Sequence, residues 1–120
     1  MGELLTKQII FTKGLVRLVG WIGIQPGYAV VIKEVQRPSA MAKLYASMGK
    51  GIEKSLHVDS LAADLAIFKV DGNSAIYLTS SDDYKFAGEF WKILNPLFRW
   101  GGDFKSKDGN HFSMFHDGRS

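Results

Sequence analysis

The strongest constraint on the fold is a strand pattern that runs directly into a turn. Residues 61–70 show the alternation of a β-strand. Asp71-Gly72-Asn73 follows and predicts a hairpin turn, because these residue types tolerate the backbone angles of tight turns. Residues 75–79 then form a second predicted strand. The two strands should pair antiparallel, so the chain should contain an antiparallel sheet.

The first of these strands carries a carboxylate on a face that we expect to be buried. Side chains alternate across a strand, so Asp64 shares a face with Phe68 and Val70. That face should point toward the core, where an unpaired carboxylate is costly. We therefore expect a metal ion, an arginine or a lysine beside Asp64.

The segments before this strand predict two helices and one further strand. Apolar residues recur at helical spacing over residues 4–22, and Gln25-Pro26-Gly27 ends this helix. Residues 28–36 are rich in valine and isoleucine and predict a strand. Pro38 and Ser39 can begin a second helix that runs to about residue 48.

The segments after the hairpin predict one more helix and a short final strand. Ser80 or Ser81 caps the helix, and Pro96 ends it. Its apolar stripe should pack on the sheet and consists of Phe86, Phe90, Ile93 and Leu94. Residues 99–116 should form a loop, a turn and the last strand. The element order predicts an α+β fold, a small antiparallel sheet flanked by helices, in one domain spanning residues 1–120.

Composition narrows the ligands and partners of this chain. It has no cysteine, so a disulfide or a thiolate metal site is excluded, and any metal must be held by His, Asp or Glu. A net charge of +3 would suit an anionic partner. The charges are mixed in sign and form no Lys/Arg run, so we expect no nucleic-acid binding.

The apolar run over residues 9–24 does not have the character of a membrane segment. It contains Lys13 and Arg17 and is too short to span a bilayer, so we expect no stable membrane insertion. It also lacks the small-residue cleavage pattern of a secretory signal. We therefore expect a soluble protein that is made in the cytoplasm.

Two histidines and two aspartates could form a hydrolytic metal site. His57, Asp64 and His111 would fill three of the four positions around zinc and leave the fourth for water, with Asp108 as a spare acid. Spacing alone does not decide the matter. His57 could equally lie on the surface, Asp64 in an ordinary salt bridge and Asp108 in a simple turn.

Four separated motifs resemble the ordered signature of the M15 zinc peptidases. They are Ser55-x-His57, Ala62-x-Asp64-Leu65, Trp100-Gly101-Gly102-Asp103-Phe104 and Asp108-x-x-His111-Phe112. That family includes D-Ala-D-Ala carboxypeptidases, D-Ala-D-Ala dipeptidases and bacteriophage L-alanyl-D-glutamate endolysins. The resemblance covers roughly residues 9–116 and implies an antiparallel sheet flanked by helices, of the Hedgehog/DD-peptidase type.

The resemblance also implies a role for each site residue. His57, Asp64 and His111 would bind zinc, and Asp108 would be the general base that takes a proton from the attacking water. Arg37, in Gln36-Arg37-Pro38, falls where the family places an arginine that faces the substrate. Its guanidinium would hold the polarised carbonyl oxygen or a substrate carboxylate.

One rival ligand and two departures from the family pattern accompany this assignment. His116 lies five residues after His111, so a straight strand would place the two side chains on opposite faces, and the resemblance selects His111. Ser60 stands where the family usually has glycine. Ser113 stands where it often has glutamate, which removes an acid that could orient a ligand.

The function implied by the resemblance is that of a compact phage endolysin. Such an enzyme would cut the L-Ala-D-Glu bond in the peptide stem of peptidoglycan, as a monomer that stays in the host cytoplasm until a holin opens the inner membrane. Two alternatives remain open from the sequence. One is a D-Ala-D-Ala carboxypeptidase or dipeptidase of the same fold, and the other is a noncatalytic module that binds the cell wall.

Overall fold

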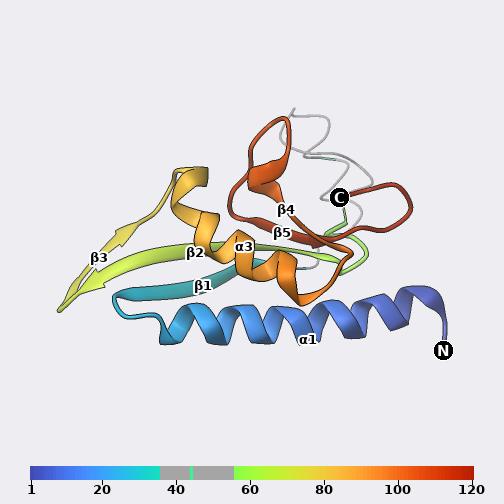
Figure 1. The fold of residues 1–120 in the computed structure, drawn as a ribbon, viewed down its shortest axis with the longest axis horizontal. Coiled ribbons are helices and arrows are strands. Elements are labelled where there is room, and N and C mark those ends of the chain that lie inside the picture. Colours follow the sequence, from blue (N-terminus) through green and yellow to red (C-terminus); the bar gives the residue numbers. More distant parts are fainter. Residues whose placement is uncertain (36–43, 45–55) are drawn as a thin grey trace.

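A computed structural model describes residues 1–35, 44 and 56–120 (Figure 1). In chain order, the described elements are α1 (Glu3–Ile24), β1 (Tyr28–Glu34), β2 (Ala62–Asp71), β3 (Ser74–Tyr77), the 3₁₀ turn η1 (Ser81–Tyr84), α3 (Lys85–Leu94), β4 (Phe98–Trp100), the 3₁₀ turn η2 (Gly101–Asp103) and β5 (His111–Met114). The helix predicted over residues 38–48 lies outside the described residues. Among the described helices, none is long and apolar enough to cross a membrane.

The described strands form one antiparallel sheet in the order β1-β2-β5-β4, with β3 also paired to β2. The predicted hairpin between β2 and β3 is confirmed, and Gly72 takes the positive φ of 58° that its turn requires. The second strand begins at Ser74, one residue earlier than predicted, and ends at Tyr77. The α+β class predicted from the element order is confirmed.

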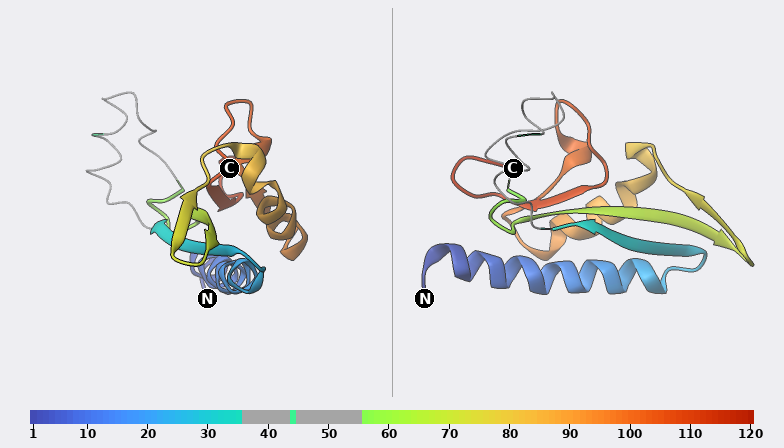
Figure 2. Two further views of the ribbon diagram at one scale, coloured as in Figure 1. Left: turned by 90° about the vertical axis from the view of Figure 1, so that its left-hand side faces the viewer. Right: turned by 180° about the vertical axis from the view of Figure 1, so that it is seen from behind.

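Helix α1 runs along β1 and β2 and supplies one side of the core (Figure 2). Its buried apolar residues recur at helical spacing and are Phe11, Leu15, Leu18 and Ile22. Gly14 lies on the same stripe, where a Cβ atom would collide with the ring of Phe98. This close approach explains why a residue that weakens a helix stands in the middle of one.

Helix α3 packs through a different residue from those predicted. Trp91 is fully buried, stacks on Phe98 with ring centroids 3.9 Å apart, and meets Phe11 edge-on. Its indole Nε1 donates to the carbonyl oxygens of Arg99 and Ser113. Phe86, Phe90 and Leu94 are partly buried against this core. The prediction for Ile93 is wrong, since its side chain is 79% exposed.

The prediction that Asp64 faces the core is also wrong. Leu65 and Ile67 are fully buried and belong to the core formed with α1 and α3. Because side chains alternate along β2, Asp64 lies on the opposite face of the sheet. The apolar character of Phe68 and Val70 suggested the other orientation, but Phe68 is only partly buried and Val70 is exposed. The carboxylate therefore stands on the outer face, where the predicted zinc ligands gather.

The strand β4 was not predicted, since residues 99 onward were expected to begin a loop. Phe98 and Trp100 are both buried, and β4 pairs with β5 at the edge of the sheet. This pairing holds β5 between β4 and β2. It thereby fixes the strand that carries His111.

Candidate metal centre

His57, Asp64 and His111 come together on the outer face of the sheet. His57 Nε2 lies 3.4 Å from Asp64 Oδ1, and His111 Nδ1 lies 3.7 Å from the same oxygen. One potential ligand atom from each residue lies within 4.8 Å of the other two. The structure thus groups the three residues that the sequence proposed as metal ligands.

The strand register explains why Asp64 and His111 meet. Asp64 on β2 pairs directly with His111 on β5, and residues directly opposite in an antiparallel pair point to the same face. On its other side, Asp64 pairs with Glu34 of β1. Glu34, Asp64 and His111 therefore form a row across three neighbouring strands.

His57 is presented by a tight turn just before β2. The backbone N–H groups of Asp59 and Leu61 donate to the carbonyl oxygen of Leu56. The backbone N–H of Ser60 donates to the carbonyl oxygen of His57. Ser60 closes the turn with a φ of 55°, in the left-handed region that favours glycine. Glycine, which the M15 pattern usually has at this position, would make the same turn without that strain.

The hydrogen bond made by His57 leaves its other ring nitrogen for a ligand. Nδ1 lies 3.0 Å from the carbonyl oxygen of Val35, which can only accept, so Nδ1 carries the hydrogen. The Glu34 carboxylate lies 3.8 Å from the same nitrogen. Nε2, the other ring nitrogen, faces Asp64. An imidazole fixed in this way by a second group is the usual arrangement for a metal-binding histidine.

Asp64 is ionised at neutral pH in this environment. Partial burial raises the pKa of its carboxyl group, but the imidazoles of His111 and His57, which donate hydrogen bonds and carry positive charge when protonated, outweigh that effect and hold the pKa well below its usual range. The site therefore offers one anionic oxygen between two imidazoles. This donor set suits zinc, which accepts both nitrogen and carboxylate oxygen.

Asp108 lies at the rim of the cluster. Its side chain is exposed, its backbone N–H donates to the Gly101 carbonyl oxygen, and its own carbonyl oxygen accepts from the His111 N–H at 3.1 Å. Loss of hydration raises the pKa of the Asp108 carboxyl group; nearby His111 lowers it in part, and Asp64 raises it further. The Asp108 carboxyl group thus interacts electrostatically with all three cluster residues.

The Trp100–Phe104 motif shapes the loop that carries Asp108. A Cβ atom on Gly101 would collide with the backbone oxygen of Asp108, so glycine is required where the two segments touch. Trp100 Nε1 donates to the Gly109 carbonyl oxygen at 2.7 Å. Asp103, in contrast, binds Lys92 at 2.7 Å and points to a different partner. These contacts make Asp108, and not Asp103, the acid beside the cluster.

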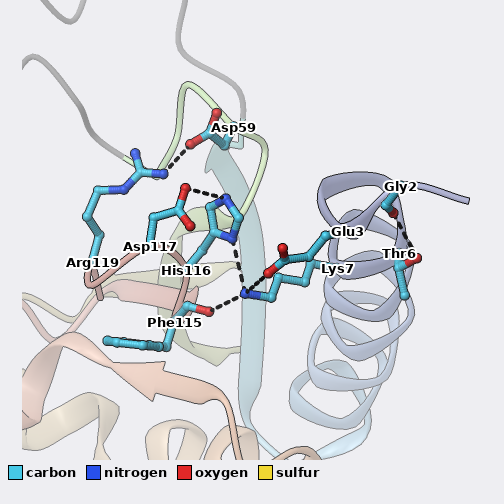
Figure 3. A network of polar contacts seen from close by, with 9 residues as sticks. All are labelled: Gly2, Glu3, Thr6, Lys7, Asp59, Phe115, His116, Asp117 and Arg119. Atoms are coloured by element: carbon cyan, nitrogen blue, oxygen red, sulfur yellow. Dashed lines mark hydrogen bonds and ion pairs between the residues drawn. The ribbon is translucent and has the colours of Figure 1, made fainter.

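His116 and Ser113, which the sequence analysis also singled out, fall outside this cluster. Arg37 lies outside the described residues. His116 follows the end of β5 and interacts with Lys7 and Asp117, so it is not a third ligand (Figure 3). Ser113 is fully buried on β5 opposite Ala62, and within the described part of the chain its hydroxyl has no hydrogen-bond partner.

Sequence reasoning missed a set of contacts that hold the His57 turn. Arg119 donates to the Asp59 carboxylate at 2.6 Å (Figure 3), and Gln8 on α1 donates to the Asp59 carbonyl oxygen at 2.8 Å. Asp117 and Gly118 both have positive φ and bend the chain so that Arg119 returns beside His116. The Asp-Gly pair was a turn signal at that position. Its long-range consequence was not visible in the sequence.

The geometry of the cluster fits a zinc ion. Two ligands bound to tetrahedral zinc at its usual bond lengths lie about 3.3 Å apart. The 3.4 Å and 3.7 Å separations are close to that value. His111 Nε2 is buried and has no hydrogen-bond partner among the described residues, and Nδ1 is the ring nitrogen that faces Asp64. A shared metal ion would draw together three ligand atoms that already lie within 4.8 Å of one another.

The comparisons with known proteins bear on the fold. No protein-family model and no curated protein matches the sequence. Among solved structures, the L-Ala D-Glu endopeptidase ChiX of Serratia marcescens superposes with a TM-score of 0.67 at 19% identity, over 92% of this chain and 84% of that chain. The chain therefore has the α+β fold of a peptidase of that kind, as the motif resemblance implied.

Proposed function

We propose that this protein is a zinc-dependent peptidase that hydrolyses the L-Ala-D-Glu bond in the peptide stem of peptidoglycan. The observation that carries the proposal is the cluster of His57, Asp64 and His111 with Asp108 at its rim, placed on the fold of an L-Ala D-Glu endopeptidase. Two imidazoles, one carboxylate and an adjacent acid are the components of a metal-assisted hydrolase.

The proposed roles follow from the contacts of each residue. His57, Asp64 and His111 hold the zinc ion, which would supply a Lewis acid that acidifies a water molecule and polarises the scissile carbonyl. Asp108 accepts a proton from the attacking water. It then donates that proton to the leaving nitrogen, so that the C–N bond breaks to give a carboxylate and an amine. The raised pKa of Asp108 brings it closer to the working pH of such a base.

Arg37 is proposed to face the substrate, on the motif resemblance alone. Its planar guanidinium would bind the carbonyl oxygen or a substrate carboxylate in a way that a lysine ammonium cannot reproduce. Arg37→Lys should keep the zinc and lose much of the turnover on a defined muropeptide. Near wild-type turnover in both Arg37→Lys and Arg37→Ala would remove this residue from the site.

The biological setting that we propose is host lysis by a bacteriophage, with the enzyme acting as a monomer. The motif resemblance to the compact endolysins supports this setting. Cytoplasmic expression in a Gram-negative host should then leave cells intact until the inner membrane is permeabilised, as a holin would do, and lysis should follow at once. Lysis before permeabilisation would contradict the holin-dependent release.

Metal analysis and product mapping together test the proposed function. The purified protein should bind one zinc per chain, His57→Ala and His111→Ala should lose it, and the control His116→Ala should retain it. Mass spectrometry of digested peptidoglycan should show new L-Ala carboxyl ends and D-Glu amino ends. Full zinc occupancy in both cluster variants would refute the site. Release of D-Ala would indicate the carboxypeptidase or dipeptidase, and zinc-loaded protein that binds the wall without cutting it would indicate a binding module.

A further inference from the structure

A polar hollow lies next to Asp108, between the end of β3 and the loop before β5. It has a volume of about 180 Å³, room for about six water molecules. Residues from both sides line it, including Thr79 and Ser81 on one side and Lys107, Asp108 and Asn110 on the other. Asp108 thus borders both this hollow and the metal cluster.

The two sides of the hollow are held together by hydrogen bonds. Gly109 N–H donates to Ser81 Oγ at 3.0 Å, and the Gly109 carbonyl oxygen accepts from Trp100 Nε1 at 2.7 Å. Gly109 also approaches Ser81 so closely that a Cβ atom at Gly109 would contact its backbone. The hollow is therefore built by the fold before any ligand arrives, which lowers the cost of binding.

The polar groups of the hollow favour an anion. Lys107 contributes an ammonium group, and within the described part of the chain it forms no ion pair. The Thr79 hydroxyl and the Asn110 amide can donate, and Ser81 accepts from Gly109 and so keeps its own hydrogen for a ligand. Asp108 is the one carboxylate on the lining. Its charge would repel a second carboxylate, so the cation of Lys107 is needed for such a ligand to bind.

We propose that this hollow is the subsite for the free carboxylate of the D-Glu residue, with Lys107 as its cation. The inference rests on the proposed function. A glutamate that is linked onward through one of its carboxyl groups keeps the other as a carboxylate, close to the bond that its nitrogen makes with L-Ala. A scissile bond placed at the cluster beside Asp108 would bring that carboxylate toward Lys107.

Two peptides that differ in one group test the subsite. One carries the D-Glu carboxylate, and in the other that carboxylate is a carboxamide. The wild-type enzyme should prefer the acid by about tenfold in kcat/KM, since a charge-assisted hydrogen bond is commonly worth that factor or more. Lys107→Gln should abolish the preference, because it should raise KM for the acid much more than KM for the amide. Lys105→Gln, an exposed lysine of the same loop outside the hollow, is the matched control and should keep the preference.

The outcomes separate this inference from the function on which it rests. Equal rates on both peptides in the wild type, or an equal loss on both in Lys107→Gln, would overturn the subsite while the peptidase remains. Absence of cleavage of either peptide by zinc-loaded wild-type protein would overturn the proposed function and the subsite with it.

Discussion

The carbonyl oxygen of Asp108 accepts a hydrogen bond from the His111 N–H, and its carboxylate interacts electrostatically with the cluster. Asp108 supplies none of the three grouped ligand atoms. Its catalytic and structural roles can therefore be separated. We expect Asp108→Ala to keep the zinc and to lower peptidoglycan hydrolysis by about a hundredfold, the usual contribution of a general base. Elemental analysis and initial rates measure the two effects. Loss of zinc would reassign Asp108 as a ligand, and a larger defect in Asp103→Ala with zinc retained would move the base to Asp103.

Ser60 stores backbone strain next to a proposed zinc ligand. The left-handed backbone of Ser60 costs the folded state about 1–2 kcal/mol. Glycine would relieve this strain, but its greater flexibility in the unfolded chain would offset part of the gain. We expect Ser60→Gly to raise the free energy of unfolding by about 0.5–1 kcal/mol. Urea titration of the metal-free protein measures this change. A loss of stability would mean that the Ser60 side chain stabilises the turn by contacts that outweigh the strain.

Tyr84 links the hairpin to the turn before α3. Its hydroxyl is buried, donates to the Leu78 carbonyl oxygen at 2.7 Å and accepts from the Ile67 N–H at 3.1 Å. Tyr84→Phe leaves both backbone groups without this partner and should lower the free energy of unfolding by about 1–3 kcal/mol. Chemical denaturation at pH 7 measures the loss. A change within experimental error would mean that water replaces the hydroxyl.

The same hydroxyl predicts how stability changes with pH. Burial raises the pKa of Tyr84 in the folded protein above its ordinary value. Its contribution to stability is therefore fully present below about pH 10 and is lost as pH rises through the folded pKa. The wild type should lose more stability than Tyr84→Phe between pH 9 and pH 11. Parallel loss in both proteins would assign the alkaline transition to other groups.

Local signals in the sequence predicted the elements that form locally. The hairpin was predictable because its turn residues and its strands are adjacent, and α1 because its stripe recurs over many turns. Strand β4 was not, because its three residues, Phe98–Trp100, are too few to show an alternation. Its pairing with β5 depends on residues that come later in the chain.

The errors in the prediction share a physical cause. The alternation in β2 placed Asp64 and Leu65 on opposite faces correctly, but the choice of the inner face depends on where α1 and α3 pack, which no local pattern contains. The same dependence exposes Ile93 and buries Trp91. The three cluster residues were found through ordered motifs, whereas Lys107, Arg119 and Gln8 carry no motif. Their roles arise only when distant segments meet.

At the scale of the whole molecule, the two ends of the chain hold the turn that presents His57. Gln8 from α1 and Arg119 near the C-terminus both bind Asp59, two residues after the histidine. We expect Arg119→Ala to weaken zinc binding by about threefold to tenfold, at the low end of the effects seen for groups that orient metal ligands. Competition with a chelator measures the affinity, and Arg17→Ala, an exposed arginine on α1, is the control. Unchanged affinity would show that Gln8 and the turn itself suffice.

The contact between Arg119 and Asp59 also determines which end of the chain can carry a purification tag. Ser120 adjoins the arginine that binds Asp59 in the His57 turn, whereas the N-terminus lies at the exposed start of α1 (Figure 1). A purification tag or a surface linker joined after Ser120 would start one residue from that contact, and a polyhistidine tag there would also compete for zinc. Attachment before Met1 leaves the contact alone. A preparation that is inactive with the tag at one end and active with it at the other would be explained by this difference.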